Sequence, residues 1–185
     1  MKATEVLMSE HRIIERMITS LNKAVNALEA GKDVPAQFFL DTSNFIRGFA
    51  DGCHHKKEEG VLFKAMAHNG MPESTGPLAM MRSEHEKGRT FNRGILTAAQ
   101  KMIAGDKAAV REVILNARGY TSLLTQHIAK EDQMLFSMAD QIIPVSQQDA
   151  VMEDFEHVEH EEIGDGVHEK YLALVDTLEK EISRF

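Results

Sequence analysis

Two stretches of the chain repeat one pattern: HHKKEEGVLF at residues 54–63 and HIAKEDQMLF at residues 127–136. The shared skeleton, H-x-x-K-E-[ED]-x-x-L-F, places a glutamate four residues after a histidine in each copy. On a helix, this spacing puts the imidazole and the carboxylate on one face, about one turn apart. The repeat therefore predicts two equivalent helices that present the same pair of polar side chains.

The rest of the chain divides into segments of helix length. Proline is rare, helix-forming residues are abundant, and breaks that contain glycine or proline recur at intervals of one helix. In four of the five segments, apolar residues recur at alternating steps of three and four, which is typical of helices in an antiparallel bundle. The expected helices span residues 3–30, 35–67, 76–104, 106–140 and 146–184.

These segments predict an all-α fold with a single domain over residues 1–185. Short connections favour antiparallel neighbours, so we expect an antiparallel four-helix bundle over residues 1–140. An additional C-terminal fifth helix, residues 146–184, should lie along it. In the second segment, Gly48 and Gly52 interrupt an otherwise apolar face.

The composition excludes several classes of protein. The 185 residues carry 21 Lys and Arg against 29 Asp and Glu, a formal net charge of −8, which argues against binding to nucleic acid or to an anionic membrane surface. One cysteine excludes an internal disulfide framework and a cysteine-based zinc cluster. No apolar run approaches the roughly 20 residues that span a bilayer, and residues 1–10 lack the apolar core of a signal peptide. We expect a cytoplasmic protein.

Polar side chains interrupt the predicted apolar faces at positions that suit a metal site. His11 and His85 lie within otherwise apolar stripes, and His127 and Glu131 lie together in another. A buried carboxylate without a partner is costly, and a cation held between carboxylate and imidazole removes that cost. Nitrogen and oxygen donors in a bundle core suit iron, manganese or zinc. With the first copy of the repeat included, the candidate metal ligands are His11, His54, Glu58, His85, His127 and Glu131.

This ordered set, with one histidine or one His-x3-Glu pair on each helix, resembles the hemerythrin-like (HHE cation-binding) family. The contexts Glu10-His11-Arg12 and Glu84-His85-Glu86 agree with it, and the resemblance covers residues 1 to about 140. It is closer to the bacterial members than to the blood-type oxygen carriers. The resemblance implies two iron ions with an oxo or hydroxo bridge, in which the four histidines are terminal ligands and the two glutamates are bridges.

Two features depart from the family pattern. Oxygen-carrying hemerythrins have a further histidine one turn after the third-helix ligand, where this chain has Arg89. The departure argues against reversible oxygen transport and leaves room for another ligand. The C-terminal segment carries Glu156 and His160, either of which could complete the site, although a solvated acidic helix is the simpler interpretation.

The second helix offers two pairs with the same spacing. The alignment of the repeats favours His54 and Glu58, whereas simple helical periodicity from Phe45 favours His55 and Glu59. We take the first pair as ligands and expect the other pair to lie on the surface or behind the ligands.

The sequence also supports predictions for three other side chains. Cys53 has no second cysteine or activating motif nearby, so a buried, inert thiol is expected. Tyr120 lies two turns before His127, where it either packs in the core or donates a hydrogen bond to a bound oxygen species. Lys57 is expected on a solvated face.

The leading functional hypothesis is a non-haem di-iron protein that binds or reacts with dioxygen, peroxide or nitric oxide. Whether it is an enzyme, with peroxidase-, catalase- or oxidase-like activity, is left open by the sequence. The alternative is a non-catalytic iron or oxygen sensor, or an iron-homeostasis module, that acts through a partner protein. A bundle with vestigial histidines is the third hypothesis.

Overall fold

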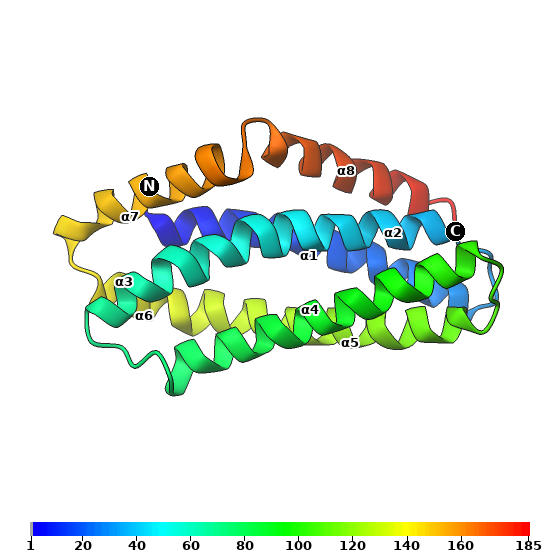
Figure 1. Cartoon of the computed structure of the whole chain (residues 1–185), viewed down its shortest axis with the longest axis horizontal. Helices are drawn as coiled ribbons and strands as arrows, with labels where there is room; N and C mark the ends of the chain where they lie inside the picture. Colours follow the sequence, from blue (N-terminus) through cyan, green and yellow to red (C-terminus); the bar gives the residue numbers. More distant parts are fainter. Residues whose placement is uncertain (1) are drawn as a thin grey trace.

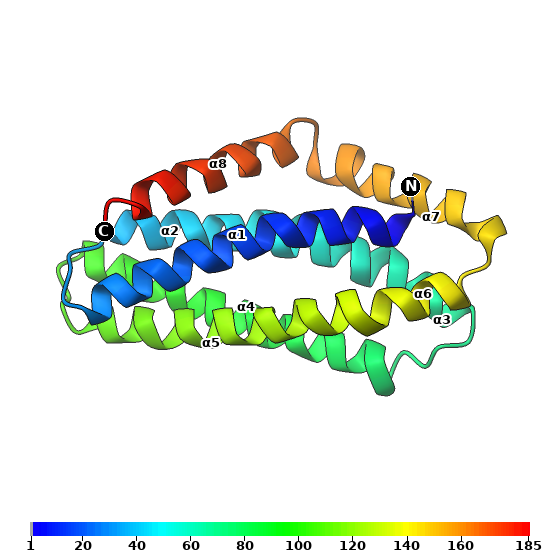
Figure 2. The same ribbon diagram turned by 180° about the vertical axis from the view of Figure 1, so that it is seen from behind.

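Four long helices form an antiparallel bundle, as Figures 1 and 2 show from opposite sides. The computed structural model describes residues 2–185, with the side chains of residues 2–161 and 164–185. The first helix is α1 (Ala3–Glu29) and the third is α4 (Gly76–Ile103). The second runs through α2 (Ala36–Phe45), η1 (Ile46–His55), η2 (Glu58–Leu62) and α3 (Phe63–His68). The fourth runs through α5 (Ala109–Lys130), η3 (Glu131–Leu135) and α6 (Phe136–Ile142).

This arrangement confirms the predicted all-α bundle. No strand occurs within residues 2–185. Proline marks three helix starts, because its fixed φ and missing N–H suit a helix N-terminus: Pro35 precedes α2, Pro77 lies in the first turn of α4, and Pro144 precedes α7. Over the same described residues, no helix is both long and apolar enough to cross a membrane.

The segments labelled η are π-helical, with hydrogen bonds from residue i to i+5. Two of them begin at the glutamates of the repeat, Glu58 in η2 and Glu131 in η3. A third, η1, ends at the adjacent residues His54 and His55, which are both buried. The wider turn changes which residues share a face, so a pattern based on 3.6 residues per turn does not describe these segments.

The C-terminal segment is two helices rather than the predicted single helix. After α7 (Val145–His157) and the π-helical η4 (Val158–Ile163), the chain turns and begins α8 (Val167–Ile182). Gly164 and Gly166 have φ of 103° and 76°, a conformation that glycine adopts easily and that ends a right-handed helix. The two helices arch over α1 and the second helix of the bundle (Figure 1).

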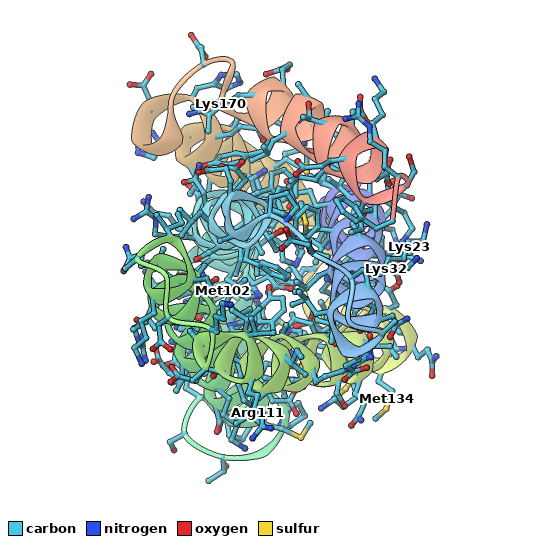
Figure 3. The ribbon with its side chains drawn as sticks, turned by 90° about the vertical axis from the view of Figure 1, so that its right-hand side faces the viewer. Lys23, Lys32, Met102, Arg111, Met134 and Lys170 are labelled. Atoms are coloured by element: carbon cyan, nitrogen blue, oxygen red, sulfur yellow. The ribbon has the colours of Figure 1, made fainter. Side chains whose placement is uncertain are left out.

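The apolar core consists of two clusters, one towards each end of the bundle. The first contains Ile14, Phe49, Ile95 and Tyr120 and includes the inner face of α8. The second contains Leu7, Phe63 and Phe136 and includes the inner face of α7. Figure 3 looks along the bundle and shows side chains filling the space between the helices, with Lys170 on the outer face of α8. Between the clusters, along each helix, lie the histidines and glutamates of the sequence motifs.

Besides its apolar face, α8 contacts the bundle through an ion pair and through a close ring contact. The Arg16 guanidinium donates two hydrogen bonds to the Glu179 carboxylate, at 2.9 and 2.7 Å. The Tyr171 ring packs directly on Gly48, where an added β-carbon would lie 1.7 Å from the tyrosine hydroxyl oxygen. Gly48, which interrupts the apolar face of the second helix, is therefore the place where α8 approaches.

Gly48→Ala tests this approach. Alanine normally stabilises a helix interior by about 0.5–1 kcal/mol relative to glycine, but here its methyl group would displace the Tyr171 ring, and overpacking of this kind costs about 1–3 kcal/mol. We expect a lower free energy of unfolding in chemical denaturation. The matched control is Gly60→Ala, since nothing lies within 4 Å of an added β-carbon there. Equal stability of the two variants would contradict this packing.

Candidate metal centre

Five histidines and two glutamates meet in the middle of the bundle, and we call them the inner cluster. Each is at most 4% exposed. Their donor atoms form two groups that share Glu58, and within each group the atoms lie within 4.8 Å of one another. One group is His55, Glu58, His85 and His127; the other is His11, His54, Glu58 and Glu131. The structure thus brings all six predicted ligands together and adds His55.

Each glutamate lies between histidines of different helices. Glu58 has one carboxylate oxygen 3.5 Å from His54 Nε2 and the other 3.4 Å from His85 Nε2. Glu131 Oε2 lies 3.3 Å from His11 Nε2 and 3.2 Å from His127 Nε2. This placement suits a carboxylate that bridges two cations.

The other ring nitrogen, Nδ1, of every histidine in the inner cluster faces a carboxylate. The outer carboxylates, with their distances to Nδ1, are Asp132 to His11 (2.7 Å), Glu10 to His54 (2.9 Å), Asp51 to His55 (3.4 Å), Glu59 to His85 (2.7 Å) and Glu84 to His127 (2.9 Å). Because an ionised carboxylate only accepts hydrogen bonds, Nδ1 carries the proton and Nε2 keeps its lone pair. Histidines that bind metals in proteins are oriented in this way.

Each outer carboxylate forms an ion pair with a basic side chain, and Arg89 serves two of them. The ion pairs are Arg12 with Asp132, Lys57 with Glu10 (2.6 Å), Arg89 with Asp51 (2.6 Å) and Glu59 (2.9 Å), and Lys130 with Glu84. No lysine or arginine in the described part of the chain pairs with Glu58 or Glu131. Of the described carboxylates in and around the inner cluster, Glu58 and Glu131 at its centre are therefore the two without a basic partner.

The repeat explains this network position by position. Lys57 and Lys130 occupy the same place in the two copies, and each pairs with a glutamate that immediately precedes His11 or His85. The acidic residue that follows Glu58 or Glu131, which is Glu59 or Asp132, holds the Nδ1 of a histidine on a neighbouring helix.

The phenylalanine at the last position of the repeat packs against a histidine of the inner cluster in both copies. Phe136 stacks on His11 with ring centroids 5.4 Å apart, and Phe63 stacks towards His85 at 6.1 Å. The two halves of the centre are thus built alike from one repeated set of residues.

His55 breaks this symmetry, since the second copy has Ile128 at the equivalent position. The sequence offered two alternative ligand pairs, His54 with Glu58 and His55 with Glu59. We expected the second pair to lie on the surface or behind the ligands. For His55 this expectation is wrong: its ring stacks on His85 at 3.8 Å, inside the cluster. The cause is the π-helical η1, which ends at His55 and buries both adjacent histidines. Glu59 does lie behind the cluster, as an outer carboxylate.

The C-terminal residues considered as extra ligands point away. Glu156 is exposed, and His160, whose side chain is 60% exposed, pairs with Asp165 at 2.7 Å. The buried face of this segment carries Phe155 and Val158 instead. Sequence reasoning missed the residue of this segment that does reach inward: Glu159, which contacts Lys57 at 2.6 Å.

For two neighbours of the inner cluster, the structure contradicts one prediction from the sequence and confirms the other. Lys57, predicted to be solvated, is fully buried between Glu10 and Glu159. Cys53 is buried as predicted, and burial together with the charge of Glu10 raises its pKa to about 12. The thiol therefore stays protonated near neutral pH, which agrees with an inert role.

The electrostatics of the inner cluster favour a cation. Burial, followed by the neighbouring histidines, lowers the pKa of His54 well below its usual value, that of His55 to about 3 and that of His85 to about 2. Their imidazoles are neutral and can donate lone pairs. Burial and the charge of Glu131 raise the pKa of Glu58 well above its usual range.

The hydrogen-bond inventory agrees. Both oxygens of Glu58 and Glu131, and the Nε2 atoms of His11, His54 and His55, are buried without a hydrogen bond to any described residue. Such unpaired buried acceptors are rare in folded proteins. Their nitrogen and oxygen donor set fits iron, manganese or zinc.

Comparison with known proteins agrees with a cation-binding site in this bundle. The family model for the hemerythrin HHE cation binding domain matches residues 2–139, a span that contains the whole inner cluster. Uncharacterized proteins of Mycobacterium bovis and of two Mycobacterium tuberculosis strains are 24% identical to the chain over 180 residues, which is 97% of this chain and 70% of each relative. No solved structure matches the chain significantly.

Replacing the inner carboxylates separates metal binding from folding. In chelator-treated protein, Glu58→Gln and Glu131→Gln remove unpaired buried acidic groups, so each should raise the free energy of unfolding by about 1–3 kcal/mol. Adding iron should stabilise the unaltered protein against thermal unfolding and have little effect on either variant.

The control is Glu156→Gln, because Glu156 is exposed and should change neither quantity. The metal assignment would be contradicted if iron stabilised all four proteins equally.

Proposed function

Because the chain belongs to the hemerythrin HHE cation-binding domain family, we propose that it is a non-haem di-iron protein that binds or reacts with dioxygen, peroxide or nitric oxide. The family and the buried cluster together suggest a metal-binding module. One observation supports the proposal most: all five histidines of the inner cluster have Nδ1 held by a carboxylate, and two glutamates that lack a basic partner lie between their Nε2 atoms.

We assign the residues to two ions according to the contacts of the glutamates. One ion is held by His11 and His54, and the other by His55, His85 and His127. Glu58 and Glu131 contact histidines of both sets and are assigned as the shared ligands. In this assignment His55 is the fifth histidine of the centre. Oxygen-carrying hemerythrins have a further histidine on the third helix, where this chain has Arg89.

The surrounding residues hold these donors in place. The outer carboxylates fix each imidazole in one tautomer and orientation, and they are held in turn by ion pairs with Lys57, Lys130, Arg12 and Arg89. The phenylalanines of the repeat pack against the rings of His11 and His85. Iron bound there would supply one-electron redox chemistry and coordination positions for small ligands.

A sensor that acts through a partner protein is the second candidate, and one contact favours it. Glu159 of the C-terminal segment bonds Lys57, Lys57 bonds Glu10, and Glu10 bonds His54. The packing of the C-terminal helices is therefore connected to the inner cluster by three direct contacts.

Iron content and His55→Ala test the proposal. We expect the unaltered protein to retain about two irons per chain, and His55→Ala to lose most of one, because one ion loses a histidine while the other keeps its ligands. Iron is measured by elemental analysis and by near-ultraviolet absorption of the loaded protein. His160→Ala, at an exposed histidine, is the control.

Rapid mixing of the reduced protein with dioxygen, peroxide or nitric oxide then tests reactivity. A change in the iron spectrum with at least one of them supports the leading function. Retained iron that responds to none of the three favours the sensor. Protein that holds no iron after loading would contradict both.

A further inference from the structure

A cavity of about 320 Å³ opens between the second helix and α4, beside the inner cluster. Its inner end is formed by His55, Gly88, Asn92 and Tyr120. Its volume is at the small end of the range for ligand pockets in proteins. Because Gly88 has no side chain, the cavity extends past α4 to the Tyr120 ring, which lies on α5.

Polar atoms without partners face the inner end. Tyr120, only 2% exposed, has a hydroxyl that makes no hydrogen bond to any described residue. Asn92 donates from Nδ2 to the Ser43 carbonyl at 3.2 Å, which fixes the amide, while its buried Oδ1 has no partner in the same residues. One donor and one acceptor at the inner end of the cavity therefore have no partner among the described residues.

The mouth is positively charged. Arg47 and Arg93 line it and are exposed, and neither forms an ion pair with a carboxylate among the residues that the structure describes. Arg89, by contrast, is neutralised by Asp51, Glu59 and Glu86. Two guanidinium groups at the mouth thus remain available to an anion.

The wall between the mouth and the inner end is apolar. Leu40, Ile46 and Leu96 line it, together with the Tyr120 ring. A ligand that fits all three parts is anionic at one end, apolar in the middle and able to accept and donate a hydrogen bond at the other end.

We propose that this cavity binds a small amphipathic organic anion. Its carboxylate lies at Arg47 and Arg93, its carbon chain lies along the apolar wall, and a terminal hydroxyl accepts from Tyr120 and donates to Asn92. The inference rests on the proposed function, because it places the ligand against His55, a residue that we assign to the metal centre.

Calorimetric titration of the iron-loaded protein with octanoate and ω-hydroxyoctanoate tests the proposal. Both should bind, and the hydroxy acid should bind several-fold more tightly. The neutral octane-1,8-diol should bind more weakly than either, since it lacks the carboxylate. The near-ultraviolet spectrum of the iron should shift when ω-hydroxyoctanoate binds.

Four variants test which part of the cavity binds which part of the ligand. The double variant Arg47→Gln with Arg93→Gln should weaken binding of both acids about five- to tenfold, which corresponds to two surface ion pairs. Arg111→Gln, at an exposed arginine of α5 that does not line the cavity, is the matched control and should change nothing. Tyr120→Phe should remove the preference for the hydroxy acid and leave octanoate binding intact. Gly88→Leu should fill the cavity and abolish binding.

The outcomes separate this inference from the function on which it rests. Calorimetry detects binding whether or not iron is present, so a protein that holds no iron but binds the acids refutes the di-iron proposal and keeps the cavity. A protein that holds two irons but binds none of the probes overturns the cavity. Equal binding of the diol and the acids, or weakening by Arg111→Gln as large as that of the double variant, also overturns it.

Discussion

The structure depends on two carboxylates, Glu58 and Glu131, that are fully buried at the centre of a helical bundle with no lysine or arginine beside them in the described part of the chain. A buried charge of this kind is tolerated only when another charge compensates for it. The imidazoles of His54, His55 and His85 cannot do so, because burial lowers their pKa and keeps them neutral. Despite burial, hydrogen bonds with Asp132 and Glu131 raise the pKa of His11. The hemerythrin HHE family and the donor atoms around the two glutamates suggest a bound cation as the compensating charge.

The charged side chains around Glu58 and Glu131 are the outer carboxylates and their basic partners. The five outer carboxylates each contact a basic side chain, with Arg89 shared by Asp51 and Glu59, so most of the charge that orients the histidines is compensated outside the centre. The C-terminal helices join this outer layer through Glu159, which with Glu10 encloses the buried Lys57. They therefore cover the bundle and also contribute to the support of His54.

Much of this could be predicted from residue patterns. The breaks and apolar stripes predicted the four helices, and the repeat placed Glu58 and Glu131 in equivalent positions. The burial of both His54 and His55 could not be predicted, because the repeat favoured one and the 3.6-residue period the other, whereas the π-helical η1 buries both. Likewise, the burial of Lys57 depends on a partner about a hundred residues away in sequence. The C-terminal break could have been predicted, since Gly164 and Gly166 are visible in the sequence.

The central claim is that the inner cluster holds two iron ions that share Glu58 and Glu131. Anomalous diffraction at the iron absorption edge, from crystals of iron-loaded protein, tests it most directly. The account predicts two peaks within the cluster, one beside His11 and His54 and one beside His55, His85 and His127, with both glutamates between them. A single peak, or peaks only among exposed acidic residues, would contradict it.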